Sequence, residues 1–291
     1  MTSGGSTMVD SDTEETALDL KTFLDTPPWD WPTDAGSTFG RILADQRASD
    51  SDRLVAAELA GDFTVINNDL ADTLLTIAGS ADEPEQLRAS AAISLGPILE
   101  QADIEGFEDP DDLPITEATF RNIQNSLEKV YRDQTTPKYV RRRILEASAR
   151  APQTWHQDAI RRAYSSGDRD WMLTAVFSMR WVRGFDDQIL QALKSEDPEI
   201  NYQAVIGAGN WELDGAWPHI VELVHDAHCS KPLLLAAISA LSCIRPAEAR
   251  NILEDLAESD DEEIAEAVSE AMAAIEGPTG EEDDEEDEWV N

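Results

Sequence analysis

The chain has 291 residues, and its 60 acidic residues against 22 Lys and Arg give a formal charge of −38. Hydrophobic residues make up 41% of the chain, which is enough to build a folded core. No stretch reaches the roughly 20 apolar residues of a membrane span, the polar start lacks a signal-peptide pattern, and two cysteines exclude a disulfide-rich scaffold. These features predict a soluble, cytoplasmic protein whose charge disfavours binding to nucleic acid.

The acidity has two sources, a tail and a background. Residues 281–288 are eight acids in a row, yet without them the formal charge is still −30. Only five of the 22 cations are Lys. Few lysines and carboxylates spread everywhere are typical of proteins from salt-in halophiles, in which molar salt screens the repulsion. We therefore interpret the background charge as a sign of habitat and not of a ligand.

The N-terminal segment, residues 1–35, precedes the regular part of the chain. Residues 1–15 are rich in Ser, Thr, Gly and Asp, and we predict them to be disordered. Residues 27–32, with the sequence Pro-Pro-Trp-Asp-Trp-Pro, cannot be helical throughout. This stretch either covers the open end of the following array or engages a partner, and covering the end is the more common use.

From residue 36 to 275 the apolar residues follow a helical period, and no convincing strand pattern occurs. The helices come in about seven antiparallel pairs, and prolines stand at or beside many of the expected helix starts. The expected first and second helices are 36–46 and 51–61, 66–78 and 84–101, 116–133 and 137–149, 153–165 and 169–182, 186–194 and 198–209, 216–227 and 231–243, and 246–258 and 261–275.

The second helices align over ten columns without gaps. The frame is set by residues 87–96, and residues 140–149, 172–181, 200–209, 233–242 and 264–273 fall under it. The first pair fits the frame loosely, around 53–60. Small residues in the columns allow close approach of neighbouring helices, and large ones fill the layer between pairs. A repeat of roughly 30 residues with two helices each predicts a solenoid.

With this second-helix pattern, best seen in Leu-Arg-Ala-Ser-Ala-Ala-Ile-Ser-Leu-Gly at 87–96, the chain resembles the HEAT-repeat family, in particular the short HEAT-like repeats of phycobilin lyases. The resemblance covers about 240 residues and implies an all-α, right-handed α-solenoid over residues 36–276. The family's second-column Arg is present at Arg88 and Arg141. Other residues replace it at Leu173, Asn201, Leu234 and Ala265.

Two further segments interrupt or follow the array. The insertion at 103–114 accounts for the longer spacing between the second helices at 87–96 and 140–149, and we predict that it forms an acidic surface loop. Residues 277–291 form the acidic tail, which ends in Trp289, Val290 and Asn291. The tail either stays disordered and solubilises the chain or docks as an acidic and aromatic motif on a basic surface, including one of its own.

A basic island stands out in the acidic chain, because eight of the 22 cations lie within residues 138–169. Its members are Lys138, Arg141, Arg142, Arg143, Arg150, Arg161, Arg162 and Arg169. One interpretation is an anion-recognising patch for an acidic peptide, the chain's own tail or phosphate. The alternative, which we favour slightly, is that the arginines pair with carboxylates such as Glu146, Asp158 and Asp168 and join neighbouring repeats.

Tryptophans gather beside this island, five of the eight between residues 155 and 217. Trp and Arg together are frequent anchors of protein interfaces. We expect Trp171 and Trp217 in the core, and Trp181 and Trp211 at the surface because they end their second helices.

The enzymatic functions known among HEAT-like proteins find little support in the residues of this chain. Trp155, Asp158, Arg161 and Arg162 superficially resemble the set of HEAT-like DNA glycosylases, but the charge of −38 argues against duplex binding. A deoxyhypusine hydroxylase needs repeated His-Glu dyads, and none of the four His precedes Glu. Nothing indicates a tetrapyrrole site for a lyase. His225, His228 and Cys229 share one helix face without an evident fourth ligand, so we assign no metal and no cofactor.

We therefore expect a non-catalytic scaffold or adaptor that binds protein partners on the concave face formed by the second helices. An enzyme or enzyme accessory on the same fold, glycosylase-like or lyase-like, is the alternative. The predicted partner-binding residues are Arg141, Arg142, Arg143, Arg161, Arg162, Trp181 and Trp211.

Overall fold

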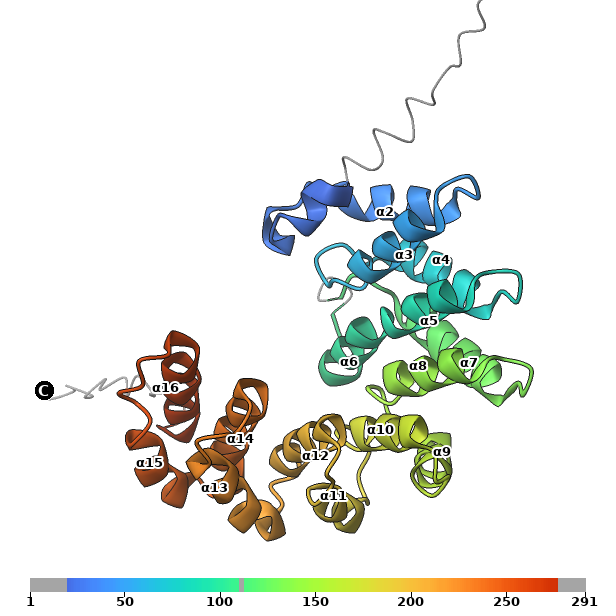
Figure 1. The fold of residues 1–291 in the computed structure, drawn as a ribbon. Coiled ribbons are helices and arrows are strands. Elements are labelled where there is room, and N and C mark those ends of the chain that lie inside the picture. Colours follow the sequence, from blue (N-terminus) through green and yellow to red (C-terminus); the bar gives the residue numbers. More distant parts are fainter. Residues whose placement is uncertain (1–19, 110–112, 277–291) are drawn as a thin grey trace, which may run out of the picture. The chain divides into compact units, whose positions relative to one another are not determined.

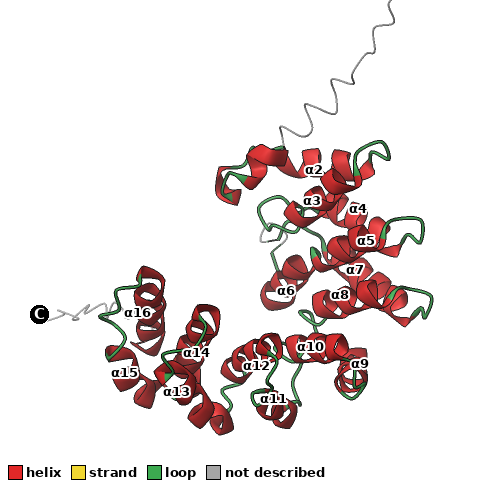
Figure 2. Cartoon of the chain, in the orientation of Figure 1, coloured by secondary structure: helices red, strands yellow, loops and turns green. Residues whose placement is uncertain are grey.

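A computed structural model describes residues 20–109 and 113–276 of the chain. This part contains helices and no strands (Figures 1 and 2), which confirms the all-α prediction. The disorder predicted for 1–15 and the behaviour predicted for the tail at 277–291 fall outside the described residues. The boundaries at 35 and 277 stay predictions.

The expected helix pairs are all present, with ends shifted by a few residues. The pairs are α2 (Ala35–Ala44) with α3 (Asp50–Leu59), α4 (Asn68–Gly79) with α5 (Glu85–Ile93), α7 (Glu117–Arg132) with α8 (Lys138–Ser148), α9 (Thr154–Tyr164) with α10 (Arg169–Ser178), α11 (Asp186–Ala192) with α12 (Pro198–Asn210), α13 (Trp217–His225) with α14 (Lys231–Ile244), and α15 (Pro246–Glu254) with α16 (Glu262–Glu276). One further α-helix, α6 (Gly96–Glu105), follows α5, and short 3₁₀ turns occur at η1 (Pro28–Asp30) and η2 (Asp214–Ala216).

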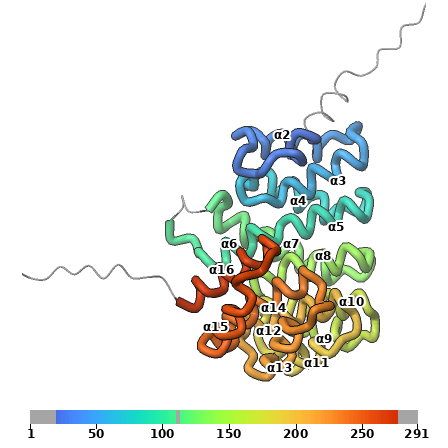
Figure 3. The backbone as a smooth tube through the Cα atoms, turned by 60° about the vertical axis from the view of Figure 1, so that its left-hand side comes forward, coloured from blue at the N-terminus to red at the C-terminus, as the bar shows by residue number. Residues whose placement is uncertain are grey.

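The chain divides into two compact units, residues 1–182 and 183–291. In the first unit each second helix packs on the next, so that α3, α5, α8 and α10 form a row. The row can be traced along the backbone tube in Figure 3. The first helices α2, α4 and α7 form a second layer. In the second unit α12, α14 and α16 pack in the same order.

The aligned columns form the core of both units. In the first column Leu87, Val140 and Ile200 are buried, and in the fifth column Ala91 and Ile144 are completely buried. Burying these apolar side chains between successive pairs is the main source of stability in such an array, since each pair alone exposes an apolar face.

The tenth column explains how closely neighbouring second helices approach. A Cβ added at Gly61 would lie 2.9 Å from the backbone of Ser94, and one added at Gly209 would lie 3.1 Å from the Cα of Ala240. Gly96 stands in the same column, and a Cβ there would meet the side chain of Arg150 at 2.9 Å. Glycine is therefore needed for space at Gly61 and Gly209, where the added atom would meet backbone, whereas at Gly96 it would meet a flexible side chain.

The second helix expected over 84–101 is broken in two, which corrects the sequence prediction. Helix α5 ends at Ile93, and α6 starts at Gly96 with Pro97 in its first turn. Pro97 has no N–H to continue the hydrogen-bond ladder, and its ring would clash with the carbonyl four residues earlier. The break creates an extra helix that carries Glu100 to the end of α8, where it contacts Arg150.

The proline-flanked stretch at the N-terminus packs on the first pair. The indole N–H of Trp31 donates to the carbonyl of Thr26 at 2.8 Å, and its ring lies edge-on to Phe23 and Phe39. Trp29, two residues earlier, is 78% exposed. One Trp of this stretch therefore covers the end of the array, while the other faces solvent.

No helix within the described ranges is both long enough and apolar enough to cross a lipid bilayer.

Candidate functional site

The face that α8 turns toward α10 carries most of the polar contacts of the basic island. Along α8, residues at intervals of four share one face of a helix, and this face meets the side chains of α10. We name this region the α8–α10 seam. Its members are Lys138, Arg142, Arg143, Glu146 and Arg150 from α8 and its end, Asp168, Asp170, Thr174, Phe177 and Trp181 from α10 and its flanks, and Glu100 from α6.

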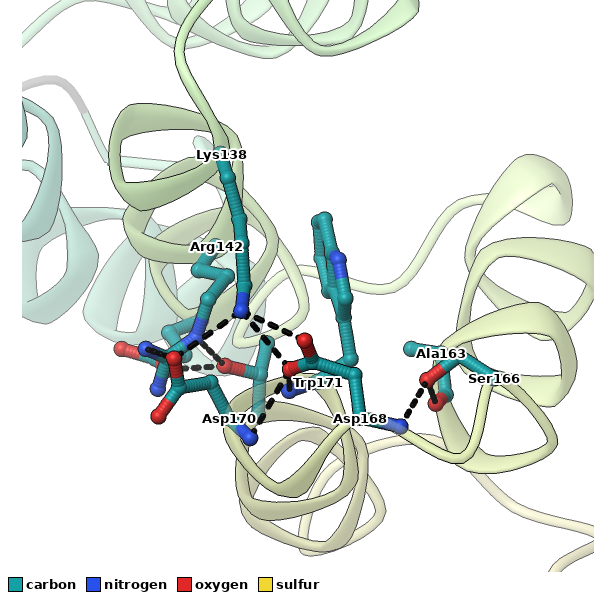
Figure 4. Close-up of polar contacts among 9 residues, drawn as sticks. Lys138, Arg142, Ala163, Ser166, Asp168, Asp170 and Trp171 are labelled. Atoms are coloured by element: carbon teal, nitrogen blue, oxygen red, sulfur yellow. Dashed lines mark hydrogen bonds and ion pairs between the residues drawn. The ribbon is translucent and has the colours of Figure 1, made fainter.

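One end of the seam is centred on Lys138 (Figure 4). Its Nζ lies 2.8 and 2.7 Å from the two carboxylate oxygens of Asp168 and 3.0 Å from Oδ2 of Asp170. Asp168 is also the N-cap of α10 and accepts hydrogen bonds from the backbone N–H groups of Asp170 and Trp171. The hydrogen bond from Lys138 lowers the pKa of Asp168, and the same bond raises the pKa of Lys138. The ammonium thus fixes the start of α10 against α8.

The middle of the seam is a buried network around Glu146, whose side chain is 4% exposed. Thr174 donates its hydroxyl hydrogen to Glu146 at 2.6 Å and accepts a hydrogen bond from Nε of Arg142 at 2.9 Å. Arg143 donates to the other carboxylate oxygen at 2.6 Å. Burial alone would lower the pKa of Arg143, but attraction by Glu146 and hydrogen bonds to Tyr139 and Glu146 raise it. Each carboxylate oxygen thus accepts one hydrogen bond, and the guanidinium of Arg142 adds an ion pair at 3.9 Å, as a buried charge requires.

The other end of the seam is aromatic. The indole N–H of Trp181 donates to Glu100 at 2.9 Å, and Arg150 donates to the second oxygen of the same carboxylate at 2.9 Å. The guanidinium carbons of Arg150 and Arg180 lie 4.9 and 4.6 Å from the centre of the Trp181 ring, within the range of cation–π attraction. Phe177 packs on the same ring, with centroids 5.0 Å apart. Trp181 is half-buried.

The structure does not gather all seven predicted partner-binding residues. Arg142, Arg143 and Trp181 belong to the seam. Arg141 lies on another flank of α8, where its Nε donates to the carbonyl of Tyr131 and its guanidinium stacks on Tyr131 and Trp171. Trp211 belongs to the second unit, where Arg183 stacks on it at 4.3 Å.

Arg161 and Arg162 lie on a first helix, α9, and not in the layer of second helices. Both are exposed. Arg161 contacts Asp158 at 3.3 Å and donates to Gln157 at 2.9 Å. All three expected carboxylates contact cations of the island, but the pairs differ in what they join. Asp158 pairs with Arg161 within α9 and Glu146 pairs with Arg143 within α8, whereas Asp168 pairs with Lys138 of the neighbouring repeat.

Trp171 and Trp217 are not in the core, so the sequence-based prediction for these two residues is wrong. Both are only half-buried, as are Trp181 and Trp211. The reason is that an arginine, and not a complete apolar shell, covers each ring: Arg141 lies 5.7 Å from Trp171 and Arg245 lies 5.4 Å from Trp217. Trp155 is the buried member of the group, stacked on His156.

The second-column arginines have a structural role that the sequence did not predict, which is to cap the preceding first helix. Nε of Arg53, Arg88 and Arg141 each donates to a carbonyl ten residues earlier, at 3.1, 3.2 and 2.9 Å respectively. These carbonyls belong to the last turn of the preceding first helix, where carbonyls lack partners within the helix. The constant spacing of ten residues was the available signal, since it links one column to one helix end.

The remaining candidates do not form a metal site in the part of the chain that the structure describes. No group of three His, Cys, Asp or Glu side chains is arranged there to hold a metal ion. His225 contacts the carbonyl of Val221, and His228 lies 3.5 Å from Asp226. Trp155 and Asp158, which superficially resemble part of a glycosylase set, differ in exposure, because the first is buried and the second exposed.

Comparison with known proteins agrees with the repeat architecture. Residues 186–273, from α11 into α16, match the family model for HEAT repeats. This match confirms the HEAT-repeat resemblance inferred from the second-helix columns. Among curated proteins, none matches the sequence closely enough to count as a relative.

Several solved structures are similar to the chain. The YibA protein of Escherichia coli is 13% identical with a TM-score of 0.47, covering 94% of this chain and 89% of its own. Human deoxyhypusine hydroxylase is 15% identical with a TM-score of 0.38, covering 91% and 98%. A designed armadillo repeat protein in complex with the peptide (KR)4 is 14% identical with a TM-score of 0.34, covering 81% and 98%.

Proposed function

We propose that this HEAT-repeat chain is a non-catalytic adaptor that binds a protein partner on the second-helix layer of its first unit, at the aromatic end of the α8–α10 seam. The observation that carries the proposal is the fixed position of Trp181. Its ring is half-buried and lies close to the guanidinium groups of Arg150 and Arg180, and its N–H is bonded to Glu100. A Trp held in one orientation loses little conformational entropy on binding, which favours its use as an anchor.

The charge of the seam supports the same surface. Lys138, Arg142, Arg143 and Arg150 meet an equal number of carboxylates, those of Glu100, Glu146, Asp168 and Asp170. The seam is therefore close to neutral in a chain of charge −38. A partner with its own negative charge meets less repulsion there than on the rest of an acidic surface.

This pairing changes the class of partner that we propose for the seam. The sequence suggested an anion-recognising patch, but the seam's cations already hold carboxylates of the same chain. We therefore propose recognition through stacking on Trp181 and the arginines beside it, by an aromatic, aliphatic or amide-bearing segment. The enzymatic alternative gains no observation in its favour, because Trp155 is buried while Arg161 and Asp158 contact each other.

The experiment is affinity capture with the tagged, full-length chain from a native lysate kept at molar salt. We expect Trp181→Ala to lose the proteins that the parent chain retains, because the anchor ring is removed while Arg150 still satisfies Glu100. Trp29→Ala is the matched control, since Trp29 is an exposed Trp of the N-terminal segment. If Trp181→Ala melts like the parent and recovers the same proteins, the seam is not the docking surface.

A further inference from the structure

The turn between α4 and α5, the two helices of the second pair, supplies a counter-charge to Arg53 of the first pair. Its Nη1 donates to one carboxylate oxygen of Glu83 at 2.7 Å and its Nη2 to the other at 2.8 Å, while Nε caps the end of α2. Both side chains are largely buried, 5% and 12% exposed. Glu83 directly precedes Pro84, the N-cap of the next second helix. The guanidinium is thus satisfied on both sides.

The next arginine of the column, Arg88, lacks this partner. Pro137 is the N-cap of the following second helix, so Thr136 takes the place that Glu83 has one repeat earlier. A threonine hydroxyl cannot neutralise a guanidinium. Among the described residues, Arg88 has one hydrogen bond, from Nε to Ala78, and no carboxylate within 4.0 Å, although only 6% of the residue is exposed.

Arg88 lines a cavity of about 480 Å³ between α4, α5, α7 and the turn that leads to α8. Its polar lining includes Arg88, Ser126, Lys129, Asp133, Thr135 and Thr136. Lys129 is exposed at the rim, and it forms no ion pair with the described residues. The cavity therefore holds two cations and one carboxylate.

That carboxylate is already engaged. Asp133 accepts hydrogen bonds from the backbone N–H and the hydroxyl of Thr135, both at 2.8 Å. These two bonds lower the pKa of Asp133, with a further contribution from the charge of Arg88. Asp133 is charged at neutral pH but leaves both cations without a direct ion pair, so the cavity keeps an excess of positive charge.

We propose that this cavity binds the carboxylate of an acidic side chain, which takes the position toward Arg88 that Glu83 takes toward Arg53. Lys129 attracts the ligand from the rim, and the hydroxyl group of Thr136 is available as a further donor. The acidic side chain comes either from a partner protein or from the chain's own acids at 281–288. The site is separate from the seam, so it does not depend on the function proposed above.

The test uses a fluorescein-labelled synthetic peptide with the sequence of residues 281–291, and fluorescence anisotropy at low salt. A control peptide carries Gln and Asn in place of the acids. Two forms of the full-length chain are compared. The first form is unchanged, and in the second form Gln and Asn replace the Glu and Asp residues at 281–288, so that its own tail cannot compete with the peptide. We expect the second form to bind the acidic peptide and not the neutral one. Weaker binding by the unchanged chain identifies its own tail as the source, and equal binding identifies a partner.

Variants in the second form locate the site. Lys129→Gln, at an exposed position, should weaken binding about tenfold, the effect of one charge-assisted hydrogen bond. Thr136→Glu should abolish binding by placing an internal carboxylate beside Arg88, and Thr136→Gln is its uncharged control of the same size. Lys194→Gln removes one exposed cation in the second unit and should change nothing.

Thermal unfolding without peptide tests the pairing with Arg88 even if both Thr136 variants block the cavity by their size. Thr136→Glu should unfold at a higher temperature than Thr136→Gln, because only the former pairs with Arg88. The proposal is overturned if acidic and neutral peptides bind alike, or if Lys129→Gln binds as well as Lys194→Gln. Equal melting of the two Thr136 variants would also contradict it.

Discussion

The imidazole of His156 lies 3.0 Å, through Nε2, from the hydroxyl oxygen of Ser148, and this contact fixes the protonation of the ring. The hydroxyl hydrogen of Ser148 goes to the carbonyl of Ile144 at 2.7 Å, so its oxygen accepts from Nε2–H. Nδ1 accepts from the backbone N–H of Gln153 at 2.8 Å. The network therefore holds a neutral imidazole at the start of α9, and burial lowers its pKa from 6.5 to about 4.

Stability should consequently fall in mild acid through His156. Because the folded pKa lies below the unfolded one, the unfolded chain binds the proton first. The contribution is complete above pH 6.5 and is lost as the pH falls toward 4. At roughly 1.4 kcal/mol per pKa unit, the loss should reach about 2 kcal/mol near pH 5. Urea unfolding of the parent and of His156→Leu measures this loss. The difference between their free energies of unfolding should be smaller at pH 5 than at pH 7, and an equal difference at both pH values would refute the assignment.

Glu83 should matter more to stability than an acid with a similarly short contact to an exposed arginine. Removing it leaves Arg53 buried without a counter-charge, which typically costs about 3–5 kcal/mol. Glu128 offers the comparison, because it contacts Arg132 at 2.6 Å but its side chain is 28% exposed and that of Arg132 is 60% exposed. Its removal should cost under about 1 kcal/mol. Urea unfolding of Glu83→Ala and Glu128→Ala measures both, and equal losses would contradict the role given to burial.

The tenth-column glycines should resist substitution for reasons of space. Gly61→Ala places a Cβ 2.9 Å from Ser94, and the resulting shift should destabilise the chain by about 1–3 kcal/mol. Gly40, inside α2, is the control because its nearest atom would be 3.8 Å away. Gly40→Ala should be neutral or stabilising by up to about 1 kcal/mol. Thermal melts of the two variants test this prediction. If Gly61→Ala melts at a higher temperature than Gly40→Ala, the two repeats can separate at little cost.

Salt should stabilise the chain. A formal charge of −38 produces self-repulsion, which ions screen over about 10 Å at 0.1 M and over shorter distances at higher concentration. The melting temperature should rise between low and molar KCl. A melting temperature that is flat or falls would remove the halophile-like interpretation of the composition.

The sequence was sufficient to locate the helix pairs, because the apolar period, the aligned columns and the prolines mark each helix independently. Gly96-Pro97 carried the signal for the break before α6, but the apolar pattern continues across it and concealed the break. The pairing of Arg143 with Glu146 follows from their spacing of three residues on α8. The hydrogen bond from Arg142 to Thr174 could not be derived, since only the packing of α8 against α10 brings these two side chains together. The missing counter-charge of Arg88 could not be predicted either. It becomes visible only when the structure shows that Thr136 holds the place of Glu83, because the two residues differ in chemistry.

The central claim, that a protein partner docks at the aromatic end of the seam, is tested most directly by hydroxyl-radical footprinting of the full-length chain with and without its captured partner. Oxidation of Trp181 should fall in the complex, while oxidation of Trp29, the exposed internal reference, should not change. Unaltered oxidation of Trp181 in a complex that is demonstrably formed would contradict the claim.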